Sequence, residues 1–380
     1  MGIIFSSFNG LEPLPKLRFL EFKNTYKKTK LNEAVERIQR RDPTSEAPVM
    51  MLSAASGFIM QSEKYSRENA GQSLKKYILL RKGELAYNHG ASKYKPFGCC
   101  FELKEDEARI PYVYHCFAVK ENNDKSYIAR LLNNQKIDQQ LKRLISSSVR
   151  MDGLLNISYE EYTGIDLYLP SLLEQQKIAD FLFLVDRRIE KQRQLVESLK
   201  KYKRGALSRV FNDVLETVKL SDISNFISSA RTLSTTLNGN KGIYPVYDAA
   251  GIAGYIDYYD IDSDYITIVK DGSGVGRLQK CDKKSSFIGT LGALVAKNCT
   301  TDFLYAVLQT IDFSKFVTGM AIPHIYYRDY KSTLLPFPSE EKQHFISQLL
   351  KKFDIYIENE TQKLTNMLAY KQGLLQQMFI

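Results

Sequence analysis

The chain lacks the segments that would place it in a membrane or in a disulfide-stabilised secreted class. Among its 380 residues no run approaches the ~20 apolar residues that a transmembrane helix needs, and no charged-then-apolar leader opens the sequence. Its five cysteines are few, odd in number and without Cys-x-x-Cys spacing, which argues against disulfides and a zinc site. These absences predict a cytoplasmic protein with reduced cysteines in its core.

Several motifs of enzymatic chemistry are also missing. The sequence has no Pro-Pro step, which an amino-methyltransferase needs to hold its target amine, and no Gly-Lys step for a Walker A loop. The stretch Gly272–Gly276 lacks the spacing of a dinucleotide loop and is expected to be a glycine-rich turn. Asp262 and Asp264 have no Glu-x-Lys companion for a nuclease metal. We therefore expect no catalytic residue, no metal site and no cofactor on this chain.

Positive charge is in excess but unevenly distributed. The formal net charge is +10, and residues 1–165 hold 26 basic against 19 acidic side chains. Residues 216–335 hold 12 of each sign. A basic excess suggests a polyanionic partner such as DNA. The second half of the chain would need a locally basic face to bind one.

The strongest feature that is present is a tandem duplication. Residues 155–211 return at residues 323–379 with a constant offset of 168 and no gap. The same residue type stands in both copies at Ile157, Tyr159, Tyr162, Pro170, Ser171, Gln175, Ile178, Leu182, Asp186, Ile189, Tyr202, Lys203, Gly205, Leu207 and Phe211. A repeat far longer than the 20–50 residues of a solenoid unit indicates two whole domains, each followed by its own long helix.

The second part of each repeat has apolar residues in steps of four and three, the spacing of a two-stranded helical seam. The predicted seam residues are Ile178, Leu182, Val185, Ile189, Val196 and Leu199 in the first copy, and Ile346, Leu350, Phe353, Ile357, Leu364 and Met367 in the second, with Gln192 and Glu360 in the same stripes. Pro170 and Pro338 mark the helix starts, and Ser171 and Ser339 are candidate N-caps.

The two stripes predict that the helices pair with each other. Because the first helix leads from one domain into the next, antiparallel pairing would return the chain to its starting domain. Helices of roughly 42 residues are roughly 60 Å long, so the pair would act as a spacer. Ordinary core helices of a larger bundle are the alternative.

The expected fold is α+β, with two similar domains separated by a pair of long antiparallel coiled-coil helices and related by a pseudo-twofold axis. The expected boundaries are an N-terminal tail at 1–28, domain one at 29–168, spacer helix one at 169–213, domain two at 214–336 and spacer helix two at 337–380. Lys30-Leu31 and Lys219-Leu220 open the two domains.

Within domain one we expect strands near 48–52, 77–80, 84–87 and 111–119 and an amphipathic helix near 126–145. Within domain two we expect a strand at Tyr265–Val269, a turn through Asp271–Gly274, a strand and turn over Phe287–Lys297 and a helix from about Asp302. Asn240–Gly254 contains three glycines and Pro245, so it is expected to be loop-rich.

With these residues in view, the chain resembles the DNA-specificity (S) subunit of Type I restriction-modification systems. The resemblance covers nearly the whole chain. It rests on Leu169–Ala179 with Leu182, Asp186 and Ile189, on Lys203–Leu207 with Phe211, and on the stretches Pro15–Phe19, Gly242–Tyr247 and Thr318–Pro323. The second helix start departs from the family pattern, since Glu340-Glu341-Lys342 stands where the first copy has Leu172-Leu173-Glu174.

The resemblance implies a non-catalytic subunit. In that family each recognition domain reads one half of a split double-stranded DNA site, and the helices set the distance between the halves. The subunit docks two modification subunits, which methylate adenine with S-adenosylmethionine, and restriction subunits, which translocate DNA with ATP and Mg²⁺ and then cut it. These cofactors are therefore expected on partner chains. The alternatives are a DNA methyltransferase or nuclease acting alone, and a structural coiled-coil adaptor.

Base reading needs Arg or Lys for guanine and Asn or Gln for adenine on exposed loops, with other polar groups on phosphates. The DNA-binding candidates in the first half are Arg81, Lys82, Asn88, His89, Ser92, Lys93, Tyr94, Lys95, Asn156 and Tyr159. Those in the second half are Lys270, Ser273, Arg277, His324, Tyr326 and Tyr327. Asn156 with His324, and Tyr159 with Tyr327, are equivalent positions of the repeat.

Overall fold

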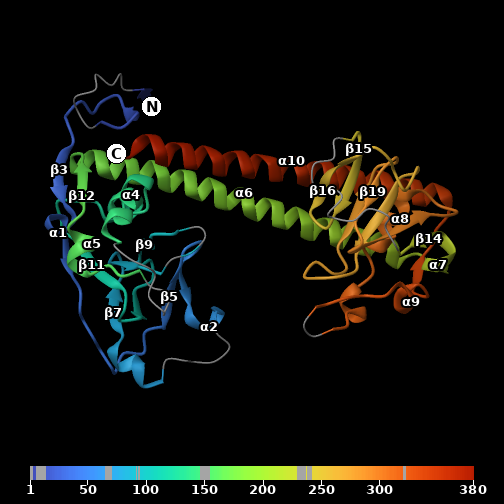
Figure 1. Ribbon diagram of the computed structural model, residues 1–380, viewed down its shortest axis with the longest axis horizontal. Helices are drawn as coiled ribbons and strands as arrows, with labels where there is room; N and C mark the ends of the chain where they lie inside the picture. The colour runs from blue at the N-terminus through green and yellow to red at the C-terminus, as the bar shows by residue number, and fades with distance from the viewer. Residues whose placement is uncertain are drawn as a thin grey trace. The chain divides into compact units, whose positions relative to one another are not determined.

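The computed structural model describes residues 3–5, 14–64, 71–90, 92, 95–145, 155–228, 237, 242–319 and 322–380. The chain forms two compact units, Met1–Lys191 with Leu364–Ile380, and Gln192–Lys363. Each unit combines a β-rich domain with part of two long helices, α6 (Leu172–Asn212) and α10 (Glu340–Met378) (Figure 1). The expected α+β class is confirmed. No helix in these described ranges has the length and hydropathy to cross a membrane.

The domain of unit 1 is built around an antiparallel four-stranded sheet in the order β4-β11-β8-β9. Its elements in chain order are β1 (Ile3–Phe5), β2 (Leu17–Phe19), β3 (Lys27–Lys30), α1 (Leu31–Ala34), β4 (Val35–Arg37), β5 (Met50–Ser53), β6 (Gly57–Met60), α2 (Gln61–Lys64), a 3-10 helix (Gly71–Lys76), β7 (Ile78–Arg81), β8 (Leu85–Asn88), β9 (Cys99–Glu102), β10 (Glu107–Ile110), β11 (His115–Val119), α3 (Lys125–Leu131), α4 (Gln135–Leu144), α5 (Tyr159–Thr163) and β12 (Asp166–Leu169).

The domain of unit 2 repeats this plan with an antiparallel sheet in the order β14-β20-β17-β18. Its elements are β13 (Thr217–Lys219), α7 (Leu220–Ile223), β14 (Ser224–Ile227), β15 (Tyr244–Asp248), β16 (Gly251–Ile256), β17 (Tyr265–Val269), β18 (Leu278–Cys281), β19 (Ser286–Phe287), β20 (Leu291–Ala296), α8 (Thr301–Leu308), a 3-10 helix (Phe313–Phe316), α9 (Tyr327–Tyr330) and β21 (Leu334–Pro336). The pairing of β3 with β12 returns as that of β13 with β21. The duplication therefore extends to strand order.

Several expected elements occur where the sequence places them. The strand at Tyr265–Val269 and the turn that follows it are present, with Gly272 at φ +96°. Helix α8 begins at Thr301, one residue before the expected start. The strand expected at 111–119 begins only at His115, because Tyr114 N donates to Pro111 O in a turn before it. All five cysteines are free, and only Cys299 is not fully buried.

The single helix expected near 126–145 is wrong, because α3 and α4 are separate helices. Two asparagines at the break bind the backbone with their side chains. Asn133 Nδ2 donates to Ala129 O at 2.9 Å, and Asn134 Oδ1 accepts from Lys136 N at 2.9 Å as the N-cap of α4. Short amide side chains compete with the helical backbone in this way and favour helix ends.

The loop expected over residues 240–254 is also wrong for its described part, 242–254. Strands β15 and β16 form a hairpin there, and β19 adds a parallel third strand. Val246 and Tyr247 are both buried although they are neighbours, because a β-bulge shifts the register between them. Gly251 begins β16 at φ +137°, a conformation that favours glycine. The glycines therefore shape a hairpin instead of preventing one.

Both long helices begin directly after the repeated Pro-Ser step. Ser171 Oγ accepts a hydrogen bond from Glu174 N at 3.4 Å, as expected of an N-cap. The side chain of Gln175 donates to Pro170 O at 3.0 Å, and its counterpart Gln343 donates to Pro338 O at 2.9 Å. The departure at Glu340-Glu341-Lys342 therefore leaves the start of α10 unchanged.

The helices pair antiparallel, as contacts within each unit show. In unit 1 the first part of α6 packs against the last part of α10, where Asp186 and Lys371 form an ion pair at 2.6 Å. In unit 2 the last part of α6 packs against the first part of α10, where Lys203 pairs with Asp354 at 2.6 Å. Asp354 is the repeat counterpart of Asp186, and Lys371 is that of Lys203, so the two ion pairs lie at equivalent positions of the repeat. Every predicted seam residue is buried or half-buried.

Candidate nucleic-acid interface

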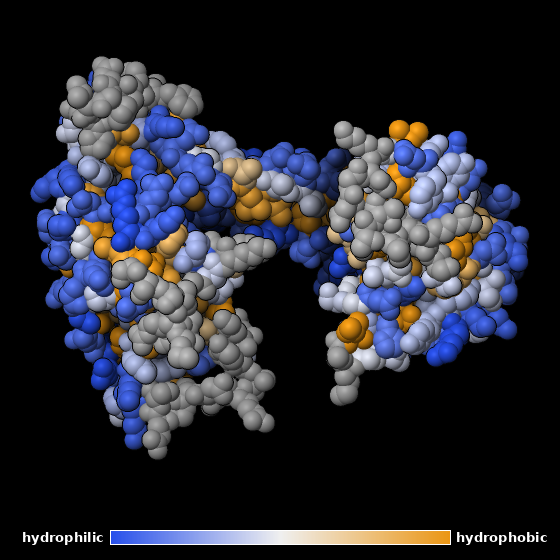
Figure 2. Space-filling view, viewed as in Figure 1, coloured by the Kyte–Doolittle hydropathy of each residue, from blue (hydrophilic) through white to orange (hydrophobic). Residues whose placement is uncertain are grey.

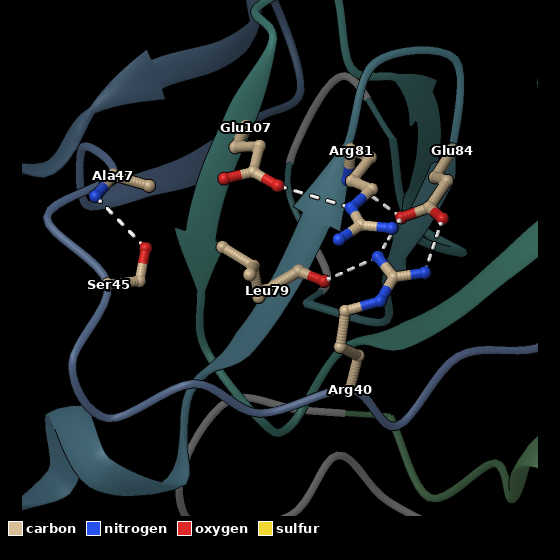
Figure 3. A network of polar contacts seen from close by, with 7 residues as sticks. All are labelled: Arg40, Ser45, Ala47, Leu79, Arg81, Glu84 and Glu107. Atoms are coloured by element: carbon tan, nitrogen blue, oxygen red, sulfur yellow. Dashed lines mark hydrogen bonds and ion pairs between the residues drawn. The ribbon is translucent and has the colours of Figure 1, made fainter.

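In unit 1 the turn between β7 and β8 carries Arg81 and Lys82, and Figure 3 shows the polar network beneath it. Arg40 donates to both carboxylate oxygens of Glu84, at 2.9 and 3.1 Å, and Glu84 also accepts from Arg81 N at 2.7 Å. Arg81 pairs with Glu107 and Lys82 with Asp106, both at 3.1 Å. The two cations remain exposed, but each has a carboxylate partner that DNA would have to displace.

The polar loop after β8 is held by its own side chains. Asn88 Oδ1 accepts from Gly90 N at 2.9 Å, and Lys95 Nζ donates to Asn133 O at 2.8 Å. His89 is buried, with its ring nitrogens 2.9 Å from Leu155 O and 3.0 Å from Val113 O. Asn88 and His89 thus serve the packing of the loop. Lys93 and Tyr94 lie outside the described residues, and Ser92 contacts Lys95.

A cluster of aromatic and imidazole rings packs against the segment 155–159. His89 and His115 stack with ring centroids 5.0 Å apart, and Tyr87 stacks on Tyr162 at 3.8 Å. His115 Nε2 lies 3.1 Å from Ile157 O, and burial lowers the pKa of His115 to about 4. The imidazole is therefore neutral near pH 7 and holds the segment without adding charge.

The segment 155–159 presents one of its candidates to solvent. Asn156 is exposed between the buried residues Leu155 and Ile157. Tyr159 is half-buried, with the Arg37 guanidinium 4.3 Å from its ring centroid. Asn156 therefore faces solvent, whereas Tyr159 packs within the domain.

In unit 2 two segments distant in sequence lie side by side. Gly272 N donates to Pro323 O at 2.9 Å, and Ile325 N donates to Lys270 O at 2.9 Å. His324 and Thr318 exchange two backbone hydrogen bonds of 2.8 Å. The turn at 270–274 and the segment around His324 therefore form one surface, on which the candidates Lys270, Ser273, His324 and Tyr326 come together.

The remaining candidates of unit 2 differ in exposure. Arg277 is exposed but donates to Ala249 O at 3.1 Å. Tyr327 stacks on Phe226 with ring centroids 4.2 Å apart, so it packs, like its counterpart Tyr159. Sequence reasoning missed Arg328, whose guanidinium lies 4.7 Å from the ring centroid of the exposed Tyr326. The sequence signal that could have found Arg328 is that it follows the repeated Tyr327 at a position where the first copy has Glu160.

Comparisons with known proteins agree with this geometry. A family model described as the Type I restriction modification DNA specificity domain matches residues 212–368. A putative type I specificity subunit of Mycoplasma pneumoniae is 29% identical over 151 residues, which are 38% of this chain and 49% of that protein. The EcoprrI type I restriction enzyme specificity subunit of Escherichia coli is 27% identical over 115 residues, 30% of this chain and 28% of that protein.

Residues 212–368 therefore belong to the Type I restriction modification DNA specificity domain family.

The matches define how far the likeness to these relatives extends. The chain spans about half the length, or less, of the curated specificity subunits that it matches. The crystal structure of a Type I S subunit from M. genitalium has a TM-score of 0.58 and 15% identity, covering 97% of this chain and 99% of that one. At this identity the match shows the fold: two β-rich domains with paired long helices.

The buried ring of His115 predicts acid sensitivity of unit 1. The pKa of His115 is about 4 in the folded chain and ordinarily 6.5. Between these two values the unfolded chain binds a proton at His115, whereas the folded chain does not. We expect the free energy of unfolding to fall by up to about 3 kcal/mol between about pH 7 and pH 4. Denaturant titration over this range should show a weaker pH dependence for His115→Gln than for the wild type. The control His344→Gln, at an exposed site on α10, should leave the dependence unchanged.

Proposed function

We propose that this specificity subunit recognises a bipartite DNA sequence, with one half-site read by each β-rich domain. The observation that carries the proposal is the duplication itself, which is visible in the sequence, in the strand order of both sheets and in the exchanged ion pairs. Two similar domains joined by antiparallel helices offer two similar DNA-binding surfaces. In this proposal the domains at 29–168 and 214–336 are the readers.

Within the proposal, the exposed polar residues of each domain contact the duplex. Asn156, Arg81 and Lys82 would serve domain one, and Lys270, Ser273, His324 and Tyr326 would serve domain two. Arginine and asparagine match guanine and adenine edges, whereas lysine and serine suit phosphates equally well. The packed residues His89, Tyr159 and Tyr327 would shape these surfaces from behind.

Catalysis in this proposal belongs to partner subunits. Modification subunits would bind S-adenosylmethionine and methylate adenine, and restriction subunits would use ATP and Mg²⁺ to translocate and cut double-stranded DNA. The direct test is methylome sequencing of a host that carries this chain with its modification subunit. We expect methylated adenines in a split motif with a spacer of fixed length. A continuous motif, or methylation independent of sequence, would contradict the proposal.

The paired helices would set the spacer length. Four residues inserted into both α6 and α10 add about 6 Å of helix, close to two base pairs of duplex rise. We therefore expect the methylated motif to gain about two base pairs of spacer while both half-sites stay the same.

A matched control separates helix length from the effect of any insertion. Four residues placed at the exposed step Glu121-Asn122 of unit 1 lengthen a loop and leave both helices intact. This variant should keep the original spacer. An unchanged spacer in the helix variant as well would show that the helices do not measure the distance.

Docking of two modification subunits is supported by residues that the repeat retains at exposed or half-exposed positions of α6 and α10. Tyr202 and Tyr370 are equivalent and 67% and 59% exposed. Gly205 and Gly373 lie one turn further, and a Cβ at Gly205 would meet open space. Glycine inside a helix costs about 1 kcal/mol relative to alanine, so its retention suggests close approach by a partner backbone. Figure 2 shows hydrophobic side chains on the visible surface of the helices.

Substitution of these glycines separates docking from stability. We expect Gly205→Leu with Gly373→Leu to leave the chain as stable as the wild type, because leucine favours helix and has room at these sites. Affinity for the modification subunit, measured by calorimetry, should fall about tenfold or more, since 1.4 kcal/mol of lost contact suffices. Lys200→Leu, at an exposed site of α6, is the control that should bind normally. Normal binding by the glycine variant would exclude this surface.

A further inference from the structure

The duplication allows the two copies to be compared position by position where the proposed DNA surfaces lie. Helix α5 begins at Tyr159 and helix α9 begins at the equivalent Tyr327. Tyr162 and its counterpart Tyr330 are both buried in their domain cores. The copies differ on either side of the first tyrosine, where unit 1 has Ser158 and Glu160 and unit 2 has Tyr326 and Arg328.

In unit 1 the two divergent positions are engaged within the domain. Ser158 caps α5, with its Oγ accepting from Glu161 N at 3.1 Å while Glu161 accepts from Ser158 N at 2.7 Å. Glu160 pairs with Arg37 at 3.1 Å, and Arg37 lies over Tyr159. The charge of Arg37 is thus balanced beside the ring it covers.

In unit 2 the position equivalent to Glu160 is a cation, Arg328, which packs on an aromatic ring. Phe226 stands opposite Tyr327, as Arg37 stands opposite Tyr159, and stacks on its ring. The side chain of Arg328 is 75% exposed and lies over Tyr326, and its nearest ion-pair contact among the described residues is the adjacent Asp329 at 3.5 Å. The guanidinium therefore projects from the domain surface with its donors accessible.

The platform under Arg328 is anchored to the domain. Tyr326 is 45% exposed and meets the His324 ring edge-on at 5.0 Å. His324 is fixed by its two backbone hydrogen bonds with Thr318, and the next residue, Ile325, donates to Lys270 O. Figure 1 shows α9 at the edge of unit 2 that lies away from the long helices. The aromatic pair thus holds the arginine on the same surface as the turn at 270–274.

We propose that Arg328 reads a guanine in the second half-site and that Tyr326 is its positioning residue. The inference rests on the proposed function and adds a specific contact to it. A planar guanidinium can donate two hydrogen bonds to guanine O6 and N7, and an aromatic ring beneath it limits its rotation before binding. Because the equivalent position in unit 1 is a carboxylate paired with Arg37, the two half-sites are read differently at this point.

The test uses the complex of this chain with its modification subunit and a DNA library randomised across the second half-site. Arg328→Lys keeps the charge but loses the two-pronged geometry, and Arg328→Gln loses both. We expect either variant to bind the preferred sequence about 10- to 100-fold more weakly and to lose the guanine preference at one position. Preferences in the first half-site should not change.

The control is Lys331→Gln, an exposed cation just after α9. It should weaken all sequences equally and leave the motif intact, as loss of a phosphate contact does. Tyr326→Ala should broaden the same guanine position as the Arg328 variants, and Tyr326→Phe, which keeps the ring, should restore it.

Two results would overturn the inference. One is an unchanged guanine position in both Arg328 variants. The other is equal weakening of every sequence by Arg328→Lys, as for Lys331→Gln. Either result leaves the proposed function standing if the wild-type complex remains sequence-specific. A wild-type complex without any sequence preference would instead contradict the proposed function itself.

Discussion

The antiparallel contact between α6 and α10 joins the two copies of the repeat and orders both helices. At its centre Gln192 Nε2 donates to Glu360 Oε2 at 2.7 Å and to Glu360 O at 2.9 Å. These residues are 168 positions apart, so each meets its own counterpart in the repeat. In an antiparallel pair, which the ion pairs of Asp186 with Lys371 and of Lys203 with Asp354 establish, a residue meets its own counterpart only where equivalent positions of the two helices cross. Hydrogen bonds from Lys363 and Gln192 keep the pKa of Glu360 below its ordinary value. A buried polar contact in an apolar seam favours one register over others.

The division between retained and divergent residues follows from this constraint. Retained residues build what both halves need: the Gln175 and Gln343 contacts at the helix starts, the exchanged ion pairs and the tyrosines packed behind the domain surfaces. Divergent residues occupy exposed positions between them, as Tyr326 and Arg328 do. A duplicated scaffold can therefore present two different surfaces without a change in its own packing.

The sequence predicted the features that depend on local pattern or on repetition. The seam residues, the Ser171 cap and the strand at Tyr265–Val269 were accessible because each follows from spacing or from a signal within a few residues. The hairpin of β15 and β16 was not, since its stability comes from burial of Val246 and Tyr247 and from pairing with β19, which is remote in sequence. The break between α3 and α4 was not predicted either, because it depends on the backbone groups that the side chains of Asn133 and Asn134 bind in the folded chain.

Burial limited the prediction of the candidate DNA surface in the same way. His89 has the residue type of a surface contact, yet carbonyl groups of Leu155 and Val113 enclose its ring. Arg328 could not be identified from the sequence, because its contact with Tyr326, and the contact of Tyr326 with His324, form only when the chain folds. The residue types of a recognition surface can be listed from a sequence, but their exposure depends on contacts distant along the chain.

A cysteine cross-link at the Gln192–Glu360 contact tests directly whether α6 pairs with α10 of the same chain. With Gln192→Cys and Glu360→Cys in one chain, mild oxidation should give a disulfide within a single chain, identified by peptide mass spectrometry, and neither single variant should give one. The native cysteines leave this readout clear, since four are buried and none lies on α6 or α10. Failure to form the link, or links only between different chains, would contradict the pairing of each helix with its own repeat.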